Sequence, residues 1–237
     1  MQEFIKGALI LCAYFGILAS VLLLLRKLIK IPDELFRKLL HYTMQGSYLL
    51  FVTVFVNWWH SALFGFLIVA VAYPVFALLG RTESFSSFMT ERRKGEFCSS
   101  LVIAFVMLAL CNAVCWGWLG DRYFGVACMY AWGIGDGFAA LIGKQFGRHK
   151  IRLKYADHKK SAEGSIAMFV TSSIAVITVL LLCGRVGVPA CIIVGLTGAG
   201  AATVVELYAP DGKDTMVCPL AAMAVMIPLM MLFGGFA

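Results

Sequence analysis

The chain has 237 residues, of which 61% are hydrophobic and only 14% are charged, with a net charge of +7. A soluble domain carries about 45–50% apolar and about 25% charged residues, so the composition excludes an ordinary soluble protein. The positive charge does not indicate nucleic acid as a partner, because the basic residues lie in short loops between apolar segments, as the positive-inside rule describes. We predict an all-α polytopic integral membrane helix bundle, with residues 1–237 as a single transmembrane domain.

Eight apolar segments are long enough to cross a bilayer, which takes about 20 helical residues. The first is interpreted as a retained anchor, because it lacks the basic start and the cleavage site of a signal peptide. Pro32, followed by Asp33 and Glu34, predicts a surface helix over about 32–40 that leads into the second span. The expected spans are 5–25, 40–57, 60–80, 97–119, 122–143, 164–183, 187–207 and 216–234.

Four loops hold 17 of the 20 lysines and arginines. With eight spans, all four loops fall on one side of the membrane, which the positive-inside rule makes the cytosolic side. Both termini then lie outside. If one segment is re-entrant, giving seven spans, the C-terminus changes sides while the first three loops stay together. The four loops are 26–38, 81–96, 144–160 and 208–215.

Asp136 is the clearest candidate for a functional residue. It lies within the fifth predicted span, where an acid is costly and by default indicates function. Lys144 follows eight residues later, or about 12 Å along a helix, so the carboxylate is expected below the headgroups in a pocket open to the cytosol. The alternative is a structural ion pair with a basic residue of a neighbouring helix.

The loop after this span is rich in groups that suit phosphate. Ser161 is a plausible N-cap of the sixth span, and Glu163 lies in its first turn. A helix N-terminus flanked by lysines is a ready anion site, although the spacing of a Walker A loop is absent. The alternative is a solvated basic loop that only fixes topology. The candidate phosphate-binding residues here are Lys144, Arg148, Lys159, Lys160 and Ser161.

Three acids lie at the cytosolic end of the seventh span: Glu206 borders the span, and Asp211 and Asp214 follow it. Carboxylate oxygens suit Mg²⁺, which usually shares its coordination shell with substrate phosphates. A polar turn with Pro-Asp-Gly chemistry explains Asp211 equally well. The predicted metal ligands are therefore Asp136, Glu206 and Asp214.

Two further clusters give weaker signals. Arg37, Lys38 and His41 lie near the start of the second span, with Arg37 and His41 on one helix face. The run Arg93-Lys94-Gly95-Glu96 opens the fourth span. Taken alone, each cluster is more typical of an interfacial anchor than of a site, and His60 is interpreted as an interface residue.

Together these motifs resemble the polyprenol kinase family, which includes dolichol kinase, phytol kinase and the CTP-dependent diacylglycerol kinases. The resemblance covers roughly 37–219. Its late part, with Glu206, Asp214 and Pro219, has Thr215 where the family usually has Asn, which puts the role of an amide there in doubt. Its most specific part is Gly135-Asp136-Gly137-x-Ala139-x-x-x-Gly143-x-x-x-Gly147, then Lys159-Lys160-Ser161-x-Glu163-Gly164-Ser165.

The resemblance implies transfer of the γ-phosphoryl group of a nucleoside triphosphate, usually CTP, to the hydroxyl of a prenol, a polyprenol or diacylglycerol, with Mg²⁺ as cofactor. Asp136 would bind Mg²⁺ or orient the acceptor hydroxyl. Glu163, Glu206 and Asp214 would complete the metal shell or act as base, with Asp136 and Glu163 as the catalytic pair. The basic residues, including Arg37, Lys38 and His41, would hold the nucleotide.

Two rival functions stay open. A phosphatidate cytidylyltransferase would use the same nucleotide at the same interface, but the long Lys-Asp…His-Gly-Gly…Asp-Arg signature associated with that family is not found. A membrane transporter would explain Asp136 through a broken helix, but gives the Lys-Ser-x-Glu-Gly segment no role. The acceptor lipid, the choice between CTP and ATP, the roles of the individual acids and the oligomeric state are left open by the sequence.

Overall fold

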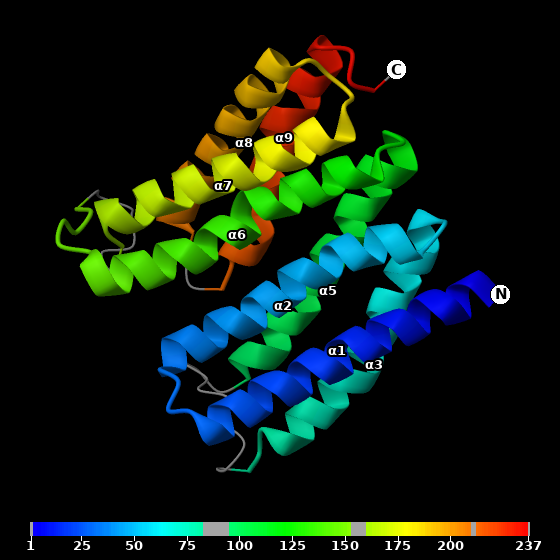
Figure 1. Ribbon diagram of the computed structural model, residues 1–237, viewed down its shortest axis with the longest axis vertical. Helices are drawn as coiled ribbons and strands as arrows, with labels where there is room; N and C mark the ends of the chain where they lie inside the picture. Colours follow the sequence, from blue (N-terminus) through cyan, green and yellow to red (C-terminus); the bar gives the residue numbers. More distant parts are fainter. Residues whose placement is uncertain (1, 83–94, 153–159, 210–211, 237) are drawn as a thin grey trace. The chain divides into compact units, whose positions relative to one another are not determined.

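The computed structural model describes residues 2–82, 95–152, 160–209 and 212–236, and these residues form an all-α helix bundle (Figure 1). A π-helix, η1, directly continues the α-helix that ends at Cys111. The helices are α1 (Gln2–Leu28), α2 (Asp33–Val54), α3 (Trp58–Leu79), α5 (Glu96–Cys111), η1 (Asn112–Trp118), α6 (Arg122–Phe146), α7 (Ala162–Cys183), α8 (Val188–Tyr208) and α9 (Asp214–Leu232).

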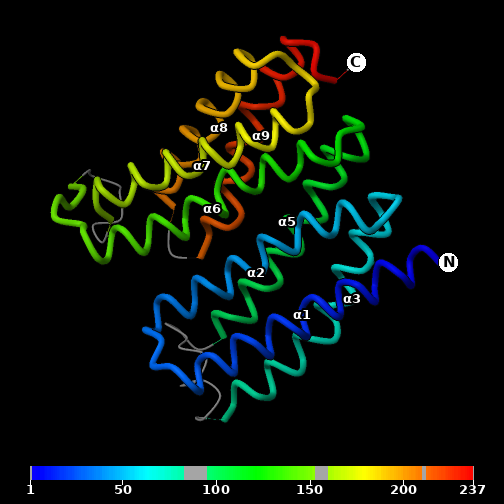
Figure 2. The backbone as a smooth tube through the Cα atoms, viewed as in Figure 1, coloured from blue at the N-terminus to red at the C-terminus, as the bar shows by residue number. Residues whose placement is uncertain are grey.

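The chain divides into two compact units, residues 1–113 and 114–237. The first unit contains α1, α2, α3 and α5. The second contains α6, α7, α8 and α9, which follow one another in alternating directions (Figure 2). The sequence-based prediction of one transmembrane domain is not tested by this division and stays a prediction.

Seven helices among the described residues are long and apolar enough to cross a membrane. They coincide with seven of the eight predicted spans to within a few residues at each end, which confirms a multi-pass membrane protein. The agreement follows from composition, because each span is an uninterrupted apolar run between polar loops. The seven are α1, α3, α5 with η1, α6, α7, α8 and α9.

Helix α2 is the element on which prediction and structure differ. The predicted surface helix and the second span form one continuous helix, Asp33–Val54, which does not reach the hydropathy of the other seven. It begins directly after Pro32, as predicted, with Asp33 and Glu34 in its first turn. Its apolar character is reduced by buried polar side chains, among them Lys38 and Gln45. The second predicted span, 40–57, is therefore long enough in the structure but is not supported by hydropathy.

The first unit is held together by aromatic packing and by a neutral polar network. The Phe51 ring contacts those of Phe64 and Phe105, with centroids 6.1 and 5.8 Å apart. Tyr48 donates to the Asn112 side-chain oxygen at 3.1 Å, and the Asn112 amide donates to Ser61 Oγ at 2.8 Å. All three polar side chains are buried, and these hydrogen bonds pair their polar groups within an apolar interior.

The second unit depends on close contact between α6 and α7. A Cβ at Gly135 would lie 2.1 Å from Ser172 Oγ and 3.0 Å from the backbone oxygen of Met168. A Cβ at Gly164 would lie 2.9 Å from the backbone oxygen of Ala139. Positions 135 and 139 are four residues apart and therefore share a helix face, as in the small-residue stripes of membrane helices. Glycine lets the two backbones meet here and fixes α6 on α7.

One end of this bundle, where α6 begins and α7 leads into α8, has a simple ion pair. Asp121 is the N-cap of α6 and accepts from the backbone N–H groups of Tyr123 and Phe124, each at 3.0 Å. Arg185 Nε lies 3.5 Å from Asp121 Oδ2. Asp121 thus satisfies free donors of a helix start, as N-cap acids commonly do.

Candidate functional site

The candidate site lies at the other end of the second unit, where α6 and α8 end and α7 and α9 begin. Its centre is an ion pair between Lys160 Nζ and Glu206 Oε1, 2.7 Å apart. The Lys160 side chain is 17% exposed and that of Glu206 is 10% exposed. Lys160 also donates to the backbone oxygen of Glu206 in the last turn of α8, where a cation complements the helix dipole.

Two more acids lie near this pair. The carboxylates of Asp136 in α6 and Asp214 in α9 are close enough to Glu206 to interact with it electrostatically. Asp214 is also in the first turn of α9, where the positive end of the helix favours an acid. The structure therefore places two of the acids predicted as metal ligands, Asp136 and Asp214, near the third, Glu206, which is paired with Lys160.

The loop between α6 and α7 is closed at its base by the backbone. The N–H of Ile151 donates to the oxygen of Lys160 at 3.1 Å, and the N–H of Ala162 donates to the oxygen of His149 at 2.9 Å. These bonds hold Lys160 beside the end of α6. The site therefore depends on the way the loop is joined as well as on the packing of the helices.

Glu163 binds this loop rather than the other acids. Its Oε1 accepts from the backbone N–H groups of Arg148 and His149, both at 3.2 Å. The ring of His149 lies with Nδ1 2.6 Å from the same oxygen, while its side chain is 83% exposed. These contacts are those of a residue that fixes the loop, and they disfavour Glu163 as metal ligand or base. The catalytic role predicted for Glu163 stays a prediction.

Ser161 is the N-cap of α7, as predicted, and its Oγ accepts from the N–H of Gly164 at 3.3 Å. The residue is 3% exposed, and a Cβ at Gly147 would lie 2.5 Å from its Oγ. With the N–H of Ala162 also bonded within the chain, the first turn of α7 already has partners. The helix start is therefore a less suitable anion site than the sequence indicates.

The other predicted phosphate ligands are placed as follows. Lys144 lies in the last turn of α6, and Arg148 lies just beyond its end; both are exposed. Lys159 lies outside the described residues, as do Arg93, Lys94 and Asp211. His149, which sequence reasoning did not single out, stands between Arg148 and Lys150 in this basic segment. Its position beside a cluster of cations was the one signal that could have identified it.

No group of three His, Cys, Asp or Glu side chains in the described ranges is arranged to hold a metal ion. The donor chemistry nevertheless suits Mg²⁺, which takes carboxylate oxygens and is often bound by only one or two of them together with substrate phosphates and water. Asp136, Glu206 and Asp214 are the residues that would hold it. One oxygen of Glu206 is meanwhile bound to Lys160.

The remaining predicted nucleotide ligands belong to the first unit. Arg37 forms an ion pair with Glu34 on the same helix, and Lys38 is buried. The ring of His41 packs against Tyr42, with centroids 5.9 Å apart. A shared site of these residues with those of the second unit stays a prediction.

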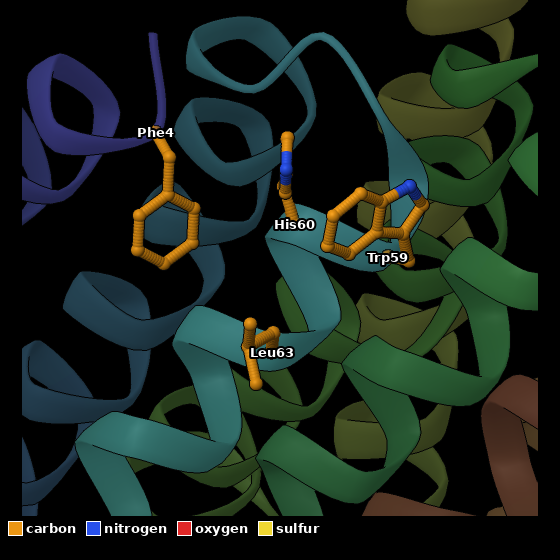
Figure 3. Close-up of a pocket in the computed structure, with 4 residues that line it drawn as sticks. All are labelled: Phe4, Trp59, His60 and Leu63. Atoms are coloured by element: carbon orange, nitrogen blue, oxygen red, sulfur yellow. The ribbon is translucent and has the colours of Figure 1, made fainter. Parts of the chain in front are cut away.

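A pocket of about 290 Å³ in the first unit has a different chemistry (Figure 3). Its walls are Phe4, Trp59, His60 and Leu63, and the His60 ring lies 3.8 Å from that of Trp59 and 5.4 Å from that of Phe4, centroid to centroid. An aromatic and apolar lining is typical of the membrane interface. These four lining residues include no lysine or arginine to bind phosphate, and the interface role predicted for His60 stays a prediction.

Comparison of the chain with protein-family models, with curated proteins and with solved structures finds no match. The resemblance to the polyprenol kinase family therefore depends on the residue pattern alone.

Proposed function

We propose that the chain is a membrane lipid kinase that transfers the γ-phosphoryl group of a nucleoside triphosphate, preferentially CTP, to the hydroxyl of a prenol, a polyprenol or diacylglycerol. The observation that carries the proposal is the Lys160–Glu206 ion pair at one end of the second unit, with Asp136 and Asp214 near Glu206. Three acids and one lysine at the ends of apolar helices are costly to keep. Phosphoryl transfer needs this combination of cationic and metal-binding groups.

The roles of the residues follow from their positions. Lys144, Arg148 and His149 are exposed beside the site and would contact the outer phosphates, while Lys160, which lies deeper, would reach the transferred group. Asp136 would orient the acceptor hydroxyl or bind Mg²⁺. When bound, Mg²⁺ would neutralise charge on the phosphate oxygens. The lipid hydroxyl would approach from the bilayer between the helices.

The proposal is tested with the purified chain in lipid. It is incubated with CTP or ATP labelled at either the α- or the γ-phosphate and with a panel of a prenol, a polyprenol, diacylglycerol and phosphatidate. We expect γ-label on one of the alcohols. Transfer of α-label to phosphatidate would instead identify a cytidylyltransferase, and the absence of transfer from both nucleotides to every lipid would refute the enzyme proposal.

The proposal also requires that the site faces the cytosol, where nucleotide is available. The excess of basic residues in the four loops supports this orientation. In a variant without native cysteines, Arg152→Cys is expected to react with an impermeant thiol reagent only from the cytosolic side. Arg185→Cys, at the other end of the bundle, is expected to react only from outside. Reaction of Arg152→Cys from outside would refute the orientation and the access of nucleotide to the site.

A further inference from the structure

The Lys160–Glu206 pair raises a question that the proposed function leaves open. Lys160 is more buried than Lys144 and Arg148, the other described phosphate candidates of the second unit, yet its ammonium already binds Glu206 through both the side chain and the backbone oxygen. Glu206 is a predicted metal ligand, yet one of its oxygens is bound to that ammonium. Neither residue can take up its proposed role fully while the pair is closed.

We infer that Lys160 changes partner during nucleotide binding: it neutralises Glu206 in the empty chain and leaves this carboxylate to bind a phosphate of the nucleotide. The inference rests on the proposed function and adds to it an order of events and a positioning role for Glu206. The empty chain holds Lys160 ready beside the site, and the incoming phosphate uncovers the carboxylate.

The energetics of the cluster favour such an exchange. An ammonium with little exposure needs a counter-charge at all times, because an unpaired buried ion is strongly unfavourable. Glu206 supplies this counter-charge when no ligand is present, and a phosphate oxygen can supply it afterwards. The freed Glu206 would then offer a carboxylate to a divalent cation at the part of the site that Asp136 and Asp214 also approach, and carboxylate oxygens suit such a cation.

With Lys160 bound, Glu206 is neutralised, and the acids have less need of a metal ion. Nucleotide and divalent cation should therefore bind cooperatively, and by thermodynamic linkage each should raise the affinity for the other by the same factor. In the absence of metal, Glu206 and the phosphate compete for Lys160.

This competition predicts that removing the charge of a site carboxylate raises the affinity for nucleotide. Glu206→Gln keeps the shape of the side chain but removes the charge that holds Lys160. In EDTA, we expect this variant to bind CTP at least about tenfold more tightly than the parent chain, because a competing charge-assisted hydrogen bond is weakened. With Mg²⁺ present, the advantage should disappear, since the variant lacks a carboxylate for the cation. A merely structural Glu206 would give equal or weaker binding in EDTA.

The experiment is a titration of the full-length chain, in lipid nanodiscs, with CTP and separately with ATP, in EDTA and in Mg²⁺. Lys160→Met/Glu206→Gln should not show the gain, because the lysine that the substitution frees is missing. Asp121→Asn, which alters the ion pair at the other end of the same bundle, should leave the affinity unchanged. If Glu206→Gln does not fold, Glu206→Asp replaces it; its shorter side chain should weaken the hold on Lys160 and give a smaller gain in EDTA.

The outcomes separate the two proposals. The partner exchange would be overturned if a folded Glu206 variant bound CTP in EDTA no more tightly than the parent chain. It would also be overturned if the gain in affinity persisted in the variant without Lys160. Both results would leave the kinase proposal intact. If the parent chain bound neither nucleotide in either condition, the nucleotide site itself would be refuted, and the exchange with it. Tighter binding in EDTA without any phosphorylated lipid would support the exchange and contradict the kinase.

Discussion

The two ends of the α6–α9 bundle carry ion pairs of opposite character. At one end, Arg185 is 52% exposed and lies 3.5 Å from Asp121, which is 6% exposed and also caps α6. At the other, Lys160 and Glu206 are 2.7 Å apart, only 17% and 10% exposed, and have two more acids nearby. The first pair is explained by the needs of a helix start. The second requires the desolvation of several charges that helix packing does not need, so it indicates function.

The largest expected effect tests whether this second end is catalytic. Asp136→Asn keeps the shape of the side chain and removes its charge, so turnover should fall about 10²–10⁴-fold, as commonly follows removal of a group that acts in the transition state. Phosphorylated lipid and thermal stability are measured on the same detergent preparation.

The matched control is Asp121→Asn at the other end, where asparagine also serves as an N-cap, and near-normal turnover is expected. Near-normal activity of a stable Asp136→Asn protein would remove Asp136 from the site. A large loss of stability with this substitution would instead indicate a structural ion pair.

The second prediction compares the ion pairs by stability. Lys160→Met leaves the Glu206 carboxylate buried without its cation and should cost about 3–5 kcal/mol. Arg185→Gln removes a cation that is 52% exposed. Asp121 is buried but keeps its two backbone N–H donors, so the cost should be less than about 1 kcal/mol. Thermal unfolding of both variants, followed by a fluorescent thiol probe or by loss of monodisperse protein, gives the ranking.

Lys160→Met/Glu206→Gln should recover much of the loss, because replacing both members of a buried pair is often nearly neutral. If Lys160→Met and Arg185→Gln lowered the free energy of unfolding equally, the two ion pairs would not differ in their contribution to stability, contrary to this prediction.

Sequence reasoning recovers the fold better than the site, and the reasons are physical. The spans are local features: an apolar run of sufficient length forms a helix in lipid whatever its neighbours are. Helix α2 was predicted in two parts because its polar residues break the apolar run, whereas in the structure they are buried within one helix. The N-cap Ser161 was predicted correctly, because capping depends on neighbouring residues alone.

The pairing within the site could not be predicted in this way. Lys160 and Glu206 are 46 residues apart, and charge alone does not say which acid a lysine will meet. The contact of Glu163 with His149 could not be predicted for the same reason, since the closed loop brings the two side chains together. The close contact of α6 and α7, in contrast, was within reach of sequence reasoning, because Gly135, Ala139 and Gly143 recur at the four-residue spacing of a packing stripe.

The third prediction tests the packing on which the charged end is built. Gly135→Ala would place a Cβ 2.1 Å from Ser172 Oγ and 3.0 Å from a backbone oxygen of α7. Such overpacking typically costs about 1–3 kcal/mol. Gly200→Ala in α8 is the matched control, because the nearest atom to its Cβ lies at an ordinary 3.7 Å. The control should be neutral or slightly stabilising, since alanine favours a helix; a stable Gly135→Ala protein would contradict the close approach.

The smallest expected effect concerns the cap at the charged end. Ser161→Ala removes the acceptor of the Gly164 N–H and should cost about 0.5–2 kcal/mol, as N-cap substitutions do. Ser161→Asn keeps an acceptor and controls for the loss of the bond, although the confined position beside Gly147 opposes a larger side chain. If Ser161→Ala lowered nucleotide affinity strongly without changing thermal stability, the hydroxyl would bind phosphate directly, contrary to what its burial indicates.

The backbone bonds between Ile151 and Lys160 and between His149 and Ala162 also have a consequence for protein engineering. They hold the two ends of the connection at a fixed separation, so that the register of α6 on α7 does not depend on its length. The entropy of closing a longer connection grows slowly, by about 0.6 kcal/mol for each doubling. An epitope or a small fluorescent reporter inserted between residues 152 and 160 should therefore be tolerated by the bundle, and a reporter placed there would lie next to the charged end.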